Sequence, residues 1–427
     1  MRVWLAAGCV VTLLAVACGG FSAKNSGTPP TTTASGSPST ATTSPASGSR
    51  QQSPSPVAAL KPCGTLPQGR PAASGQALVL ARLAGSTSWV VRDVTDIANP
   101  VTLASLGDKW QWADKSGGGT LDARLPDPST VVWADWGANY GNLIQSAPNG
   151  SSQRTLVSVT SGNAIVSFAW SPVSSDWTYL VNTPSGLEWH LVAGGSDRVL
   201  ASLPIIPPHG GRPVLDPVMV GFSADGKLMA MIDYDRTGLG GSGDRAKMQI
   251  RRTDGSLVTT DAQTGLSGGL ISDLLWVGSS LFFRDFNGIE LWDVSGVCSA
   301  LPGVQWIRPK LSPDGKRIVF ATEDSSGLSH ISVYDLSTKN VRQVSSGGGA
   351  EAWFLGSRYI WFLEERLCGA TESCGVSNAT LTGKSSVVDL TTGVSSQSRI
   401  ARIADTWPRP GQPNFDNIWW MDAAAYA

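Results

Sequence analysis

The stretch that decides the fold is Lys310-Leu311-Ser312-Pro313-Asp314-Gly315-Lys316-Arg317-Ile318-Val319-Phe320. It predicts a strand, a tight turn and a second strand. Pro313 presets φ for the first position of the turn, Asp314 can bond back to its own backbone, and Gly315 tolerates a positive φ. The apolar run that follows the turn suits a buried strand.

The same strand–turn–strand unit recurs along the chain. A close copy spans residues 220–232 and a looser one spans 168–181. Seven strand segments, each followed by a turn rich in Gly, Asn, Asp, Ser or Thr, can also be aligned. They begin at Trp89, Asn142, Glu188, Met248, Ile289, Ile331 and Ser386. A period of roughly 40–50 residues with four short strands is typical of propeller blades.

The unit resembles the WD40-like, TolB-type β-propeller repeats of bacterial envelope proteins, because Ser-Pro-Asp-Gly-Lys stands before an apolar strand. The resemblance covers about residues 77–403 and implies an all-β, seven-bladed β-propeller of four-stranded antiparallel blades. Pairs of all-β sandwiches are the alternative, but they give no reason for the repeat. The blade-like units are expected at 77–106, 107–160, 161–204, 213–262, 268–301, 304–346 and 349–403.

The end of the chain is expected to close the ring. The first blade-like unit begins at Ala77 and lacks an innermost strand, whereas residues 415–421 are rich in Ile and Trp. Such a segment suits a strand buried on both faces. Pairing the two would join the chain ends in one sheet and leave no open edge.

The beginning of the chain predicts export. Arg2 is followed by an apolar run that is too short to span a bilayer, so residues 1–17 are interpreted as a signal peptide. The run ends in Val16-Ala17-Cys18, which resembles the lipobox of bacterial lipoproteins. That resemblance implies that Cys18 is lipidated. A secreted protein cleaved after Ala17 is the alternative.

A linker then separates the expected anchor from the folded domain. Residues 18–62 begin with the lipidated Cys18 and continue as a Ser/Thr/Pro segment that has almost nothing to bury, so we expect disorder. The propeller domain is expected at 63–427. The whole predicts a monomer outside the cytoplasm, held at a bacterial membrane by its lipid.

Four cysteines remain for the folded domain once the signal peptide has left and Cys18 takes lipid. In an oxidising compartment an even number indicates disulfides. Cys368 and Cys374 lie close together in the sequence, which favours a local bridge. Cys63 with Cys298 then follows by elimination only, because four cysteines allow three pairings.

Composition argues against one class of partner. Lys+Arg number 32 against 33 Asp+Glu, so no basic footprint indicates nucleic acid. Charged residues make up only 15% of the chain and Gly numbers 48, a mixture that fits many short strands joined by turns.

One loop has partial metal-ligand spacing. Counting Asp233 as position 1, the loop places carboxylates at positions 1, 3 and 12 through Asp233, Asp235 and Asp244, with Gly238 at 6. Ca²⁺ prefers clustered oxygens, and the glycine allows a sharp turn. Position 5 is Thr237, and position 12 is Asp rather than the longer Glu. A Gly-rich hairpin loop is therefore the alternative, and calcium is the one cofactor candidate.

The 17 Trp residues allow two interpretations. Apolar rings stack on glycans, so some of them could form a sugar platform. Packing between stacked sheets accounts better for rings that lie in strand patterns. The platform candidates are Trp110, Trp112, Trp133, Trp136, Trp419 and Trp420.

We therefore expect a non-enzymatic binding or scaffolding module for a protein or glycan of the envelope. The second hypothesis is an extracytoplasmic propeller enzyme that acts on glycans as a hydrolase or lyase. The fold alone does not choose between them. Only three His residues are present and no acid/base pair stands out, which favours binding and leaves no catalytic residue to nominate.

Overall fold

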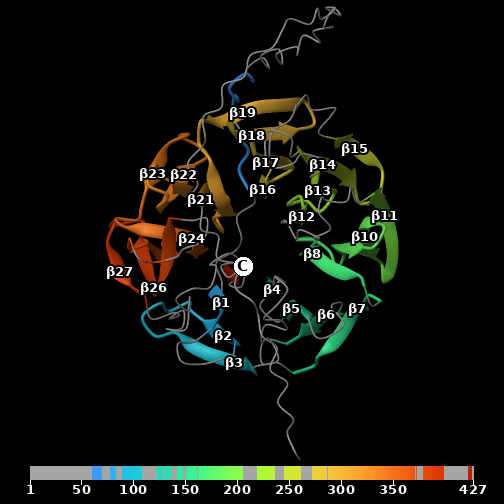
Figure 1. Ribbon diagram of the computed structural model, residues 1–427, viewed down its shortest axis with the longest axis horizontal. Helices are drawn as coiled ribbons and strands as arrows, with labels where there is room; N and C mark the ends of the chain where they lie inside the picture. The colour runs from blue at the N-terminus through green and yellow to red at the C-terminus, as the bar shows by residue number, and fades with distance from the viewer. Residues whose placement is uncertain are drawn as a thin grey trace, which may run out of the picture. The chain divides into compact units, whose positions relative to one another are not determined.

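The computed structural model describes residues 60–69, 77–82, 89–107, 123–127, 130–135, 142–147, 151–160, 162–204, 219–235, 245–260, 272–285, 287–370, 372, 378–398 and 422–425. All of them belong to one structural unit, Val57–Ala427. Within these residues, 28 strands pair into seven antiparallel sheets of four strands each. The sheets are arranged in a ring (Figure 1). The chain is a seven-bladed β-propeller, as the sequence predicts.

Each sheet is a blade, whose strands follow one another from the centre of the ring outward. Blade 1 contains β28 (Asp422–Ala425), β1 (Ala77–Arg82), β2 (Trp89–Asp93) and β3 (Val101–Gly107). Blade 2 contains β4 (Ala123–Asp127), β5 (Thr130–Asp135), β6 (Asn142–Ser146) and β7 (Arg154–Ser158). Blade 3 contains β8 (Ala164–Trp170), β9 (Trp177–Thr183), β10 (Gly186–Ala193) and β11 (Ser196–Pro204).

The remaining blades follow in chain order. Blade 4 contains β12 (Met219–Phe222), β13 (Leu228–Asp235), β14 (Arg245–Arg252) and β15 (Leu257–Thr260). Blade 5 contains β16 (Ser272–Val277), β17 (Ser280–Asp285), β18 (Gly288–Asp293) and β19 (Gly296–Pro302). Blade 6 contains β20 (Trp306–Leu311), β21 (Arg317–Glu323), β22 (Ser329–Asp335) and β23 (Val341–Gln343). Blade 7 contains β24 (Gly348–Leu355), β25 (Tyr359–Leu367), β26 (Ala379–Asp389) and β27 (Ser395–Gln397).

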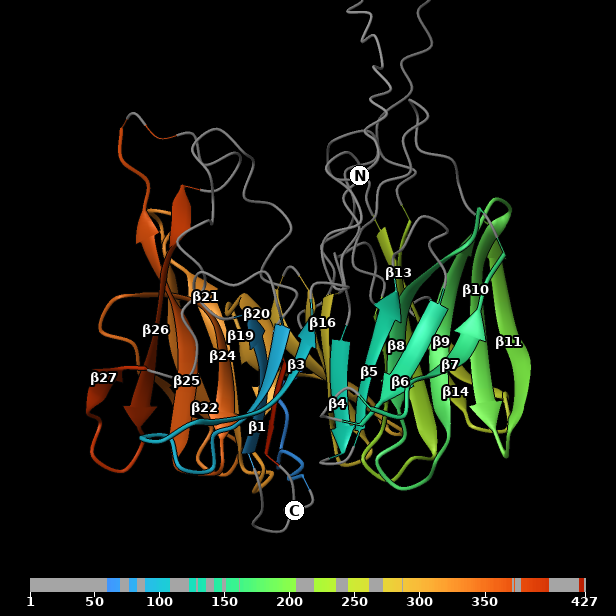
Figure 2. The same ribbon diagram turned by 90° about the horizontal axis from the view of Figure 1, so that it is seen from below.

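The two faces of the ring carry different connections. Because neighbouring strands run antiparallel, the turn between the first and second strands of a blade lies on the same face as the turn between its third and fourth strands. We call this the short-turn face; its first-to-second turns include 171–176, 223–227, 312–316 and 356–358. The opposite face carries the connections from one blade to the next. Figure 2 shows the strands running between the two faces.

Apolar side chains fill the space between neighbouring sheets. In β17, Leu281 and Phe283 pack with blade 4, whereas Phe282 between them packs with blade 6. In β21, Val319 likewise packs with blade 7 while Phe320 packs with blade 5. Because successive side chains of a strand point to opposite faces, central blade strands are apolar on both.

β28 closes the ring. It pairs antiparallel with β1, from Ala77 opposite Ala425 to Leu80 opposite Asp422. The end of the chain does supply the innermost strand of blade 1, but the segment 415–421 expected for this role lies outside the described residues. β28 contacts the inner strands β24 and β4 as well as β1.

The Ser-x-Asp-Gly turns share one set of hydrogen bonds. In blade 6, the Ser312 N–H bonds the Arg317 carbonyl at 2.8 Å, and the Ser312 hydroxyl accepts the Arg317 N–H at 2.9 Å. The same hydroxyl donates to Asp314 Oδ1 at 2.5 Å. Gly315 has a φ of 70°, the positive value that the sequence predicts. Blade 4 repeats the pattern around Ser223, and both serines are buried.

Turns of successive blades also bond one another on the short-turn face. The Ala224 N–H bonds the Gly278 carbonyl at 2.9 Å, which joins blade 4 to blade 5. Arg317 Nη2 donates to the Ser357 carbonyl at 2.5 Å, which joins blade 6 to blade 7. These contacts add polar links to the apolar packing between sheets.

Between blades 5 and 6, the corresponding polar link is made by residues 60–69, which we call the strap. The strap is the blue segment beside β16 and β19 in Figure 1. The Cys63 N–H bonds the Ser299 carbonyl of blade 5 at 2.8 Å. The Gly69 N–H bonds the Gly315 carbonyl of blade 6 at 2.8 Å. The strap therefore extends across the short-turn face from one blade to the next.

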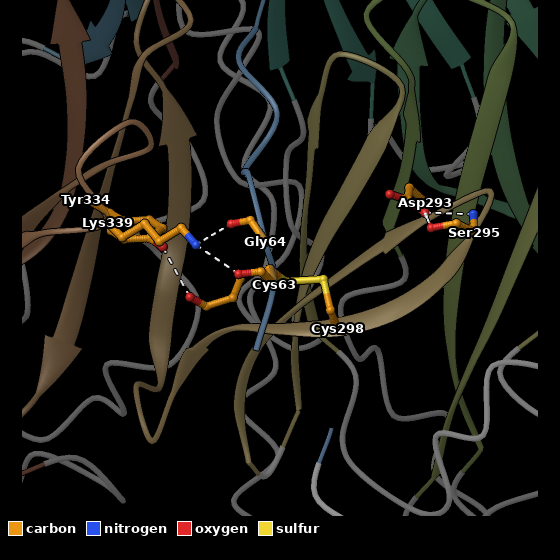
Figure 3. Close-up of a disulfide and its surroundings, with 8 residues drawn as sticks. Cys63, Gly64, Asp293, Ser295, Cys298, Tyr334 and Lys339 are labelled. Carbon is orange, nitrogen blue, oxygen red and sulfur yellow. Dashed lines mark hydrogen bonds between the residues drawn. A yellow bond between two sulfur atoms is a disulfide. The ribbon is translucent and has the colours of Figure 1, made fainter. Parts of the chain in front are cut away.

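A disulfide joins the strap to blade 5 (Figure 3). It links Cys63 to Cys298 of β19. Lys339 of blade 6 donates through Nζ to the carbonyl oxygens of Cys63, at 2.8 Å, and of Gly64. The side chains of Cys63 and Leu66 are buried in the apolar cluster of these two blades. The strap is thus fixed covalently to one blade and by hydrogen bonds to the other.

Most Trp side chains that the structure describes belong to the core. Trp189, Trp306, Trp353 and Trp361 are fully buried, which confirms the packing interpretation for them. Trp170 is only half-buried and leads to the site described next. Of the platform candidates, Trp133 is described only as part of β5; outside the described residues lie Trp110, Trp112, Trp136, Trp419 and Trp420.

Candidate binding cleft between blades 2 and 3

A cleft of about 480 Å³ lies between blades 2 and 3 on the short-turn face. Blade 2 contributes side chains of β6 and β7. Blade 3 contributes the ends of β8 and β9 and the turn that joins them. The lining residues are Gln145, Arg154, Leu156, Trp170, Ser171, Pro172, Val173, Ser174, Ser175 and Trp177.

Four stacked rings form a column that ends at this cleft. Trp170 stacks on Trp177 with centroids 5.3 Å apart and planes 8° apart. Trp177 stacks on Tyr179 at 5.1 Å, and Tyr179 stacks on His190 at 4.5 Å. Trp177 and Tyr179 are buried, whereas Trp170 is half-buried and contacts Phe168 edge-on. Trp170 is therefore the terminal ring, and it lines the cleft.

Two carboxylates hold the far end of the column. The Tyr179 hydroxyl donates to Asp197 Oδ2 at 2.5 Å. The His190 ring nitrogens lie 3.2 Å from Asp197 Oδ1 and 3.3 Å from Glu188 Oε2. Burial, followed by the hydrogen bond to Asp197, raises the pKa of Tyr179 far above its ordinary value, so this hydroxyl stays a donor. The column is therefore fixed from within the blade.

Gln145 and Arg154 form the opposite wall. They are cross-strand partners on β6 and β7. Gln145 Oε1 accepts hydrogen bonds from Arg154 Nε at 2.9 Å and from Arg154 Nη2 at 2.7 Å. This pair of bonds orients the guanidinium plane. Within the described part of the chain, the other donors of Arg154 have no partner and can serve a ligand.

The blade 3 turn supplies hydroxyl groups at the rim. It keeps the backbone bond of the other short turns, because the Ser171 N–H bonds the Asp176 carbonyl at 2.9 Å. The Asp-Gly pair is replaced by Val173-Ser174, and Ser174 Oγ accepts the Asp176 N–H at 3.3 Å. Val173, Ser174 and Ser175 are exposed. The cleft thus combines an aromatic face, an amide, a guanidinium group and hydroxyls.

A separate charged group lies on the inner strands of blades 6 and 7. Arg308 Nη1 is 2.9 Å from Glu351 Oε2, and Lys310 Nζ is 4.0 Å from Glu351 Oε1. Arg308 has a φ of 51°, a left-handed conformation uncommon outside glycine, beside a bulge in β20. Glu351 is buried and Arg308 nearly so. The pair therefore joins two blades rather than offering an open site.

The structure describes only two of the three residues predicted to bind calcium. The strand β13 continues through Asp233 and Asp235, whose backbones pair with Lys247 and Arg245 of β14. Asp244 lies outside the described residues. Among the residues that are described, no group of three or more His, Cys, Asp or Glu could hold a metal ion. Calcium binding at this loop stays a prediction.

The predicted anchor and the second bridge fall largely outside the described residues. Cys18 is not described, so its lipidation stays a prediction. Cys368 is disulfide-bonded, but its expected partner Cys374 is not described. Cys63 and Cys298, which the sequence pairs only by elimination, form the disulfide of the strap.

Sequence reasoning did not single out the walls of this cleft. A signal was present for Trp170 and Trp177, which face each other across the first two strands of blade 3. Leu311 and Ile318 have the corresponding places beside the blade 6 turn. Aligning the turn copies would have shown two aromatic rings here, where blade 6 has Leu311 and Ile318 and blade 4 has Phe222 and Met229. The blade 2 wall carries no such signal, because it flanks no recognisable motif.

Comparisons with known proteins show the fold alone. No protein-family model and no curated protein matches the sequence. A puromycin-hydrolyzing peptidase from Mycobacterium tuberculosis is similar in structure, with 13% identity, a TM-score of 0.51, and 82% of this chain and 58% of the peptidase covered. TolB from Acinetobacter baumannii has 16% identity and a TM-score of 0.40, with 65% of this chain and 62% of TolB covered. An oligogalacturonate lyase in complex with manganese has 12% identity and a TM-score of 0.47, with 79% of this chain and 86% of the lyase covered.

The chain thus spans less than two thirds of the peptidase and of that TolB. The peptidase supports the propeller architecture. The other two likenesses have TM-scores below 0.5 and carry no argument.

Proposed function

We propose that this chain is a glycan-binding module, displayed outside the cytoplasm as a membrane-anchored lipoprotein, with the cleft between blades 2 and 3 as its binding site. The observation that carries the proposal is the half-buried Trp170 at the end of a fixed aromatic column, opposite the oriented Arg154. An indole face can cover the apolar C–H face of a sugar ring. The amide, guanidinium and hydroxyl groups around it can bond the sugar hydroxyls.

The size of the cleft favours an oligosaccharide over a protein partner. About 480 Å³ is within the range of small-molecule sites, roughly 300–1,000 Å³. A stable protein partner would instead cover roughly 800 Å² on each side. The rings are held before the ligand arrives, so binding orders few side chains and loses little entropy.

The lipid anchor is supported by the sequence around Cys18. Among the described residues, no helix is long and apolar enough to cross a membrane. Mass spectrometry of the N-terminal peptide from a membrane fraction tests the anchor. We expect acylated Cys18, and an unmodified membrane-fraction peptide that begins upstream of Cys18 would contradict it.

The binding proposal is tested on a glycan array that carries neutral, acidic and amino-sugar oligosaccharides. The purified protein should bind a subset of them, and Trp170→Ala should abolish that binding. Tyr359→Ala is the matched control, because Tyr359 is a half-buried ring beside Arg358 on the same face, in blade 7. Its binding should equal that of the wild type. No binding by the wild type, or full binding by Trp170→Ala, would overturn the proposal.

A further inference from the structure

Arg154 brings a formal positive charge to a cleft with no described negative one. Among the described lining residues it is the one charged side chain. No carboxylate in the described part of the chain forms an ion pair with it, and its hydrogen bonds go to the neutral Gln145. The one formal charge among the described lining residues is therefore positive, and none of those residues carries a carboxylate that would repel an anionic ligand.

The guanidinium group is also held in position for a carboxylate. Its Nε and Nη2 atoms are both bonded to Gln145 Oε1, which fixes the plane of the fork. Arg donors match a carboxylate well, and hydrogen bonds between two charged groups are roughly twice as strong as neutral ones. A neutral sugar hydroxyl could use the same donors but would gain no charge assistance.

We infer that the ligand of this cleft is an acidic glycan, an oligosaccharide that pairs a ring carboxylate with Arg154 while one of its sugar rings stacks on Trp170. The inference rests on the proposed function and names the class of sugar for the same site. Stacking supplies affinity for sugars in general, because any ring has an apolar face. The charge of Arg154 supplies the selection for uronic acids over neutral hexoses.

Calorimetric titration of the purified protein tests this with matched pairs of probes. The acidic probes are tetramers of β-1,4-glucuronate, α-1,4-galacturonate and β-1,4-mannuronate. Each is compared with its carboxyl-reduced form, which differs only by a neutral hydroxymethyl group. We expect at least one acidic tetramer to bind about ten- to a hundredfold more tightly than its reduced form, the range for hydrogen bonds to charged groups.

Variants separate the contribution of the Arg154 charge to affinity from that of stacking on Trp170. Arg154→Gln should remove the preference for the acidic tetramer, so that it and its reduced form bind with equal affinity. Arg154→Lys keeps the charge without the fork and should recover part of the difference. Trp170→Ala should abolish binding of both forms. Arg154 is exposed, so the two Arg154 variants should keep the wild-type melting temperature.

The outcomes distinguish this inference from the proposed function. If acidic and reduced forms bind equally and Arg154→Gln changes neither, the acidic-glycan inference is wrong while the glycan cleft stands. If no tetramer of either kind binds although the array shows neutral or amino-sugar ligands, the same conclusion follows. If the array also shows no Trp170-dependent binding, the glycan site itself is overturned.

Discussion

The buried hydroxyl of Ser312 organises the turn of blade 6. It accepts the N–H groups of Lys316, at 3.2 Å, and Arg317, at 2.9 Å, and donates to Asp314. Burial alone would raise the pKa of Asp314, but the bond from Ser312, with the Lys316 N–H and the Arg317 charge, holds it below its ordinary value. Asp314 is predictable as a turn residue from its type. The role of Ser312 is not, because it depends on burial that the local sequence does not show.

A glycine pair tests how tightly the strap is docked. A Cβ at Gly315 would lie 2.4 Å from the Gly69 carbonyl oxygen, whereas one at Gly393 would meet no atom within 4 Å. Both have positive φ, so Gly393→Ala should cost about 1–2 kcal/mol for backbone strain alone. Gly315→Ala should cost about 1–3 kcal/mol more, because the strap must move. Urea denaturation measures both, and equal losses would show that the strap does not pack on this turn.

Glu365 makes the stability of the folded state depend on pH, in the direction set by the shift of its pKa. Burial raises its pKa above the ordinary 4.5, and the bond from the Ser329 N–H offsets this only in part. The folded state therefore holds the proton more tightly, so the stability from Glu365 is present below the unfolded pKa and is lost as pH rises through the folded pKa. Glu365→Gln keeps an acceptor for Ser329 and should raise the melting temperature at neutral pH, with a gain that vanishes below pH 4.5.

Glu372 is the control for that experiment. The hydrogen bond from Arg366 lowers the pKa of this exposed carboxyl to about 2, the opposite direction. Glu372→Gln should therefore leave the melting temperature at neutral pH unchanged or lower it. A wild-type melting temperature for Glu365→Gln at neutral pH would show that burial of this carboxyl carries no penalty.

Strands and turns were the most predictable elements. The sixth unit, expected at 304–346, contains β20 to β23 from Trp306 to Gln343. Apolar runs and turn residues repeat there with a clear period, and each is decided by near neighbours in sequence. Closure by the end of the chain was predictable, but β28 itself was not, because Asp422-Ala423-Ala424-Ala425 has little β propensity of its own. Its place follows from contacts with three other strands distant in sequence.

The strap is the element whose covalent link should matter most for stability. Cys63 and Cys298 are 235 positions apart, so their disulfide constrains a long loop of the unfolded chain. Removing such a bridge typically costs about 2–5 kcal/mol. The Cys63→Ser/Cys298→Ser double variant should therefore unfold at lower urea concentration under oxidising conditions. An unchanged midpoint would mean that the strap's hydrogen bonds and Leu66 hold it without the bridge.

At the scale of the whole molecule, the ring creates a site that no single repeat contains. The cleft takes one wall from the outer half of blade 2 and the other from the inner half of blade 3. The period predicts that the blades are neighbours. It does not predict which side chains meet across the gap, because that depends on register and twist. For this reason Arg154 and Trp170 emerge as a site only in three dimensions.

The location of the site is tested most directly by amide hydrogen exchange on the wild-type protein with and without a saturating concentration of the acidic tetramer that binds most tightly in the titration. We expect slower exchange in peptides that cover 142–158 and 164–177, the two walls of the cleft, and unchanged exchange in the other blades. Protection confined to the inner strands of blades 6 and 7, or to the face opposite the short turns, would contradict it. Protection nowhere would contradict it equally.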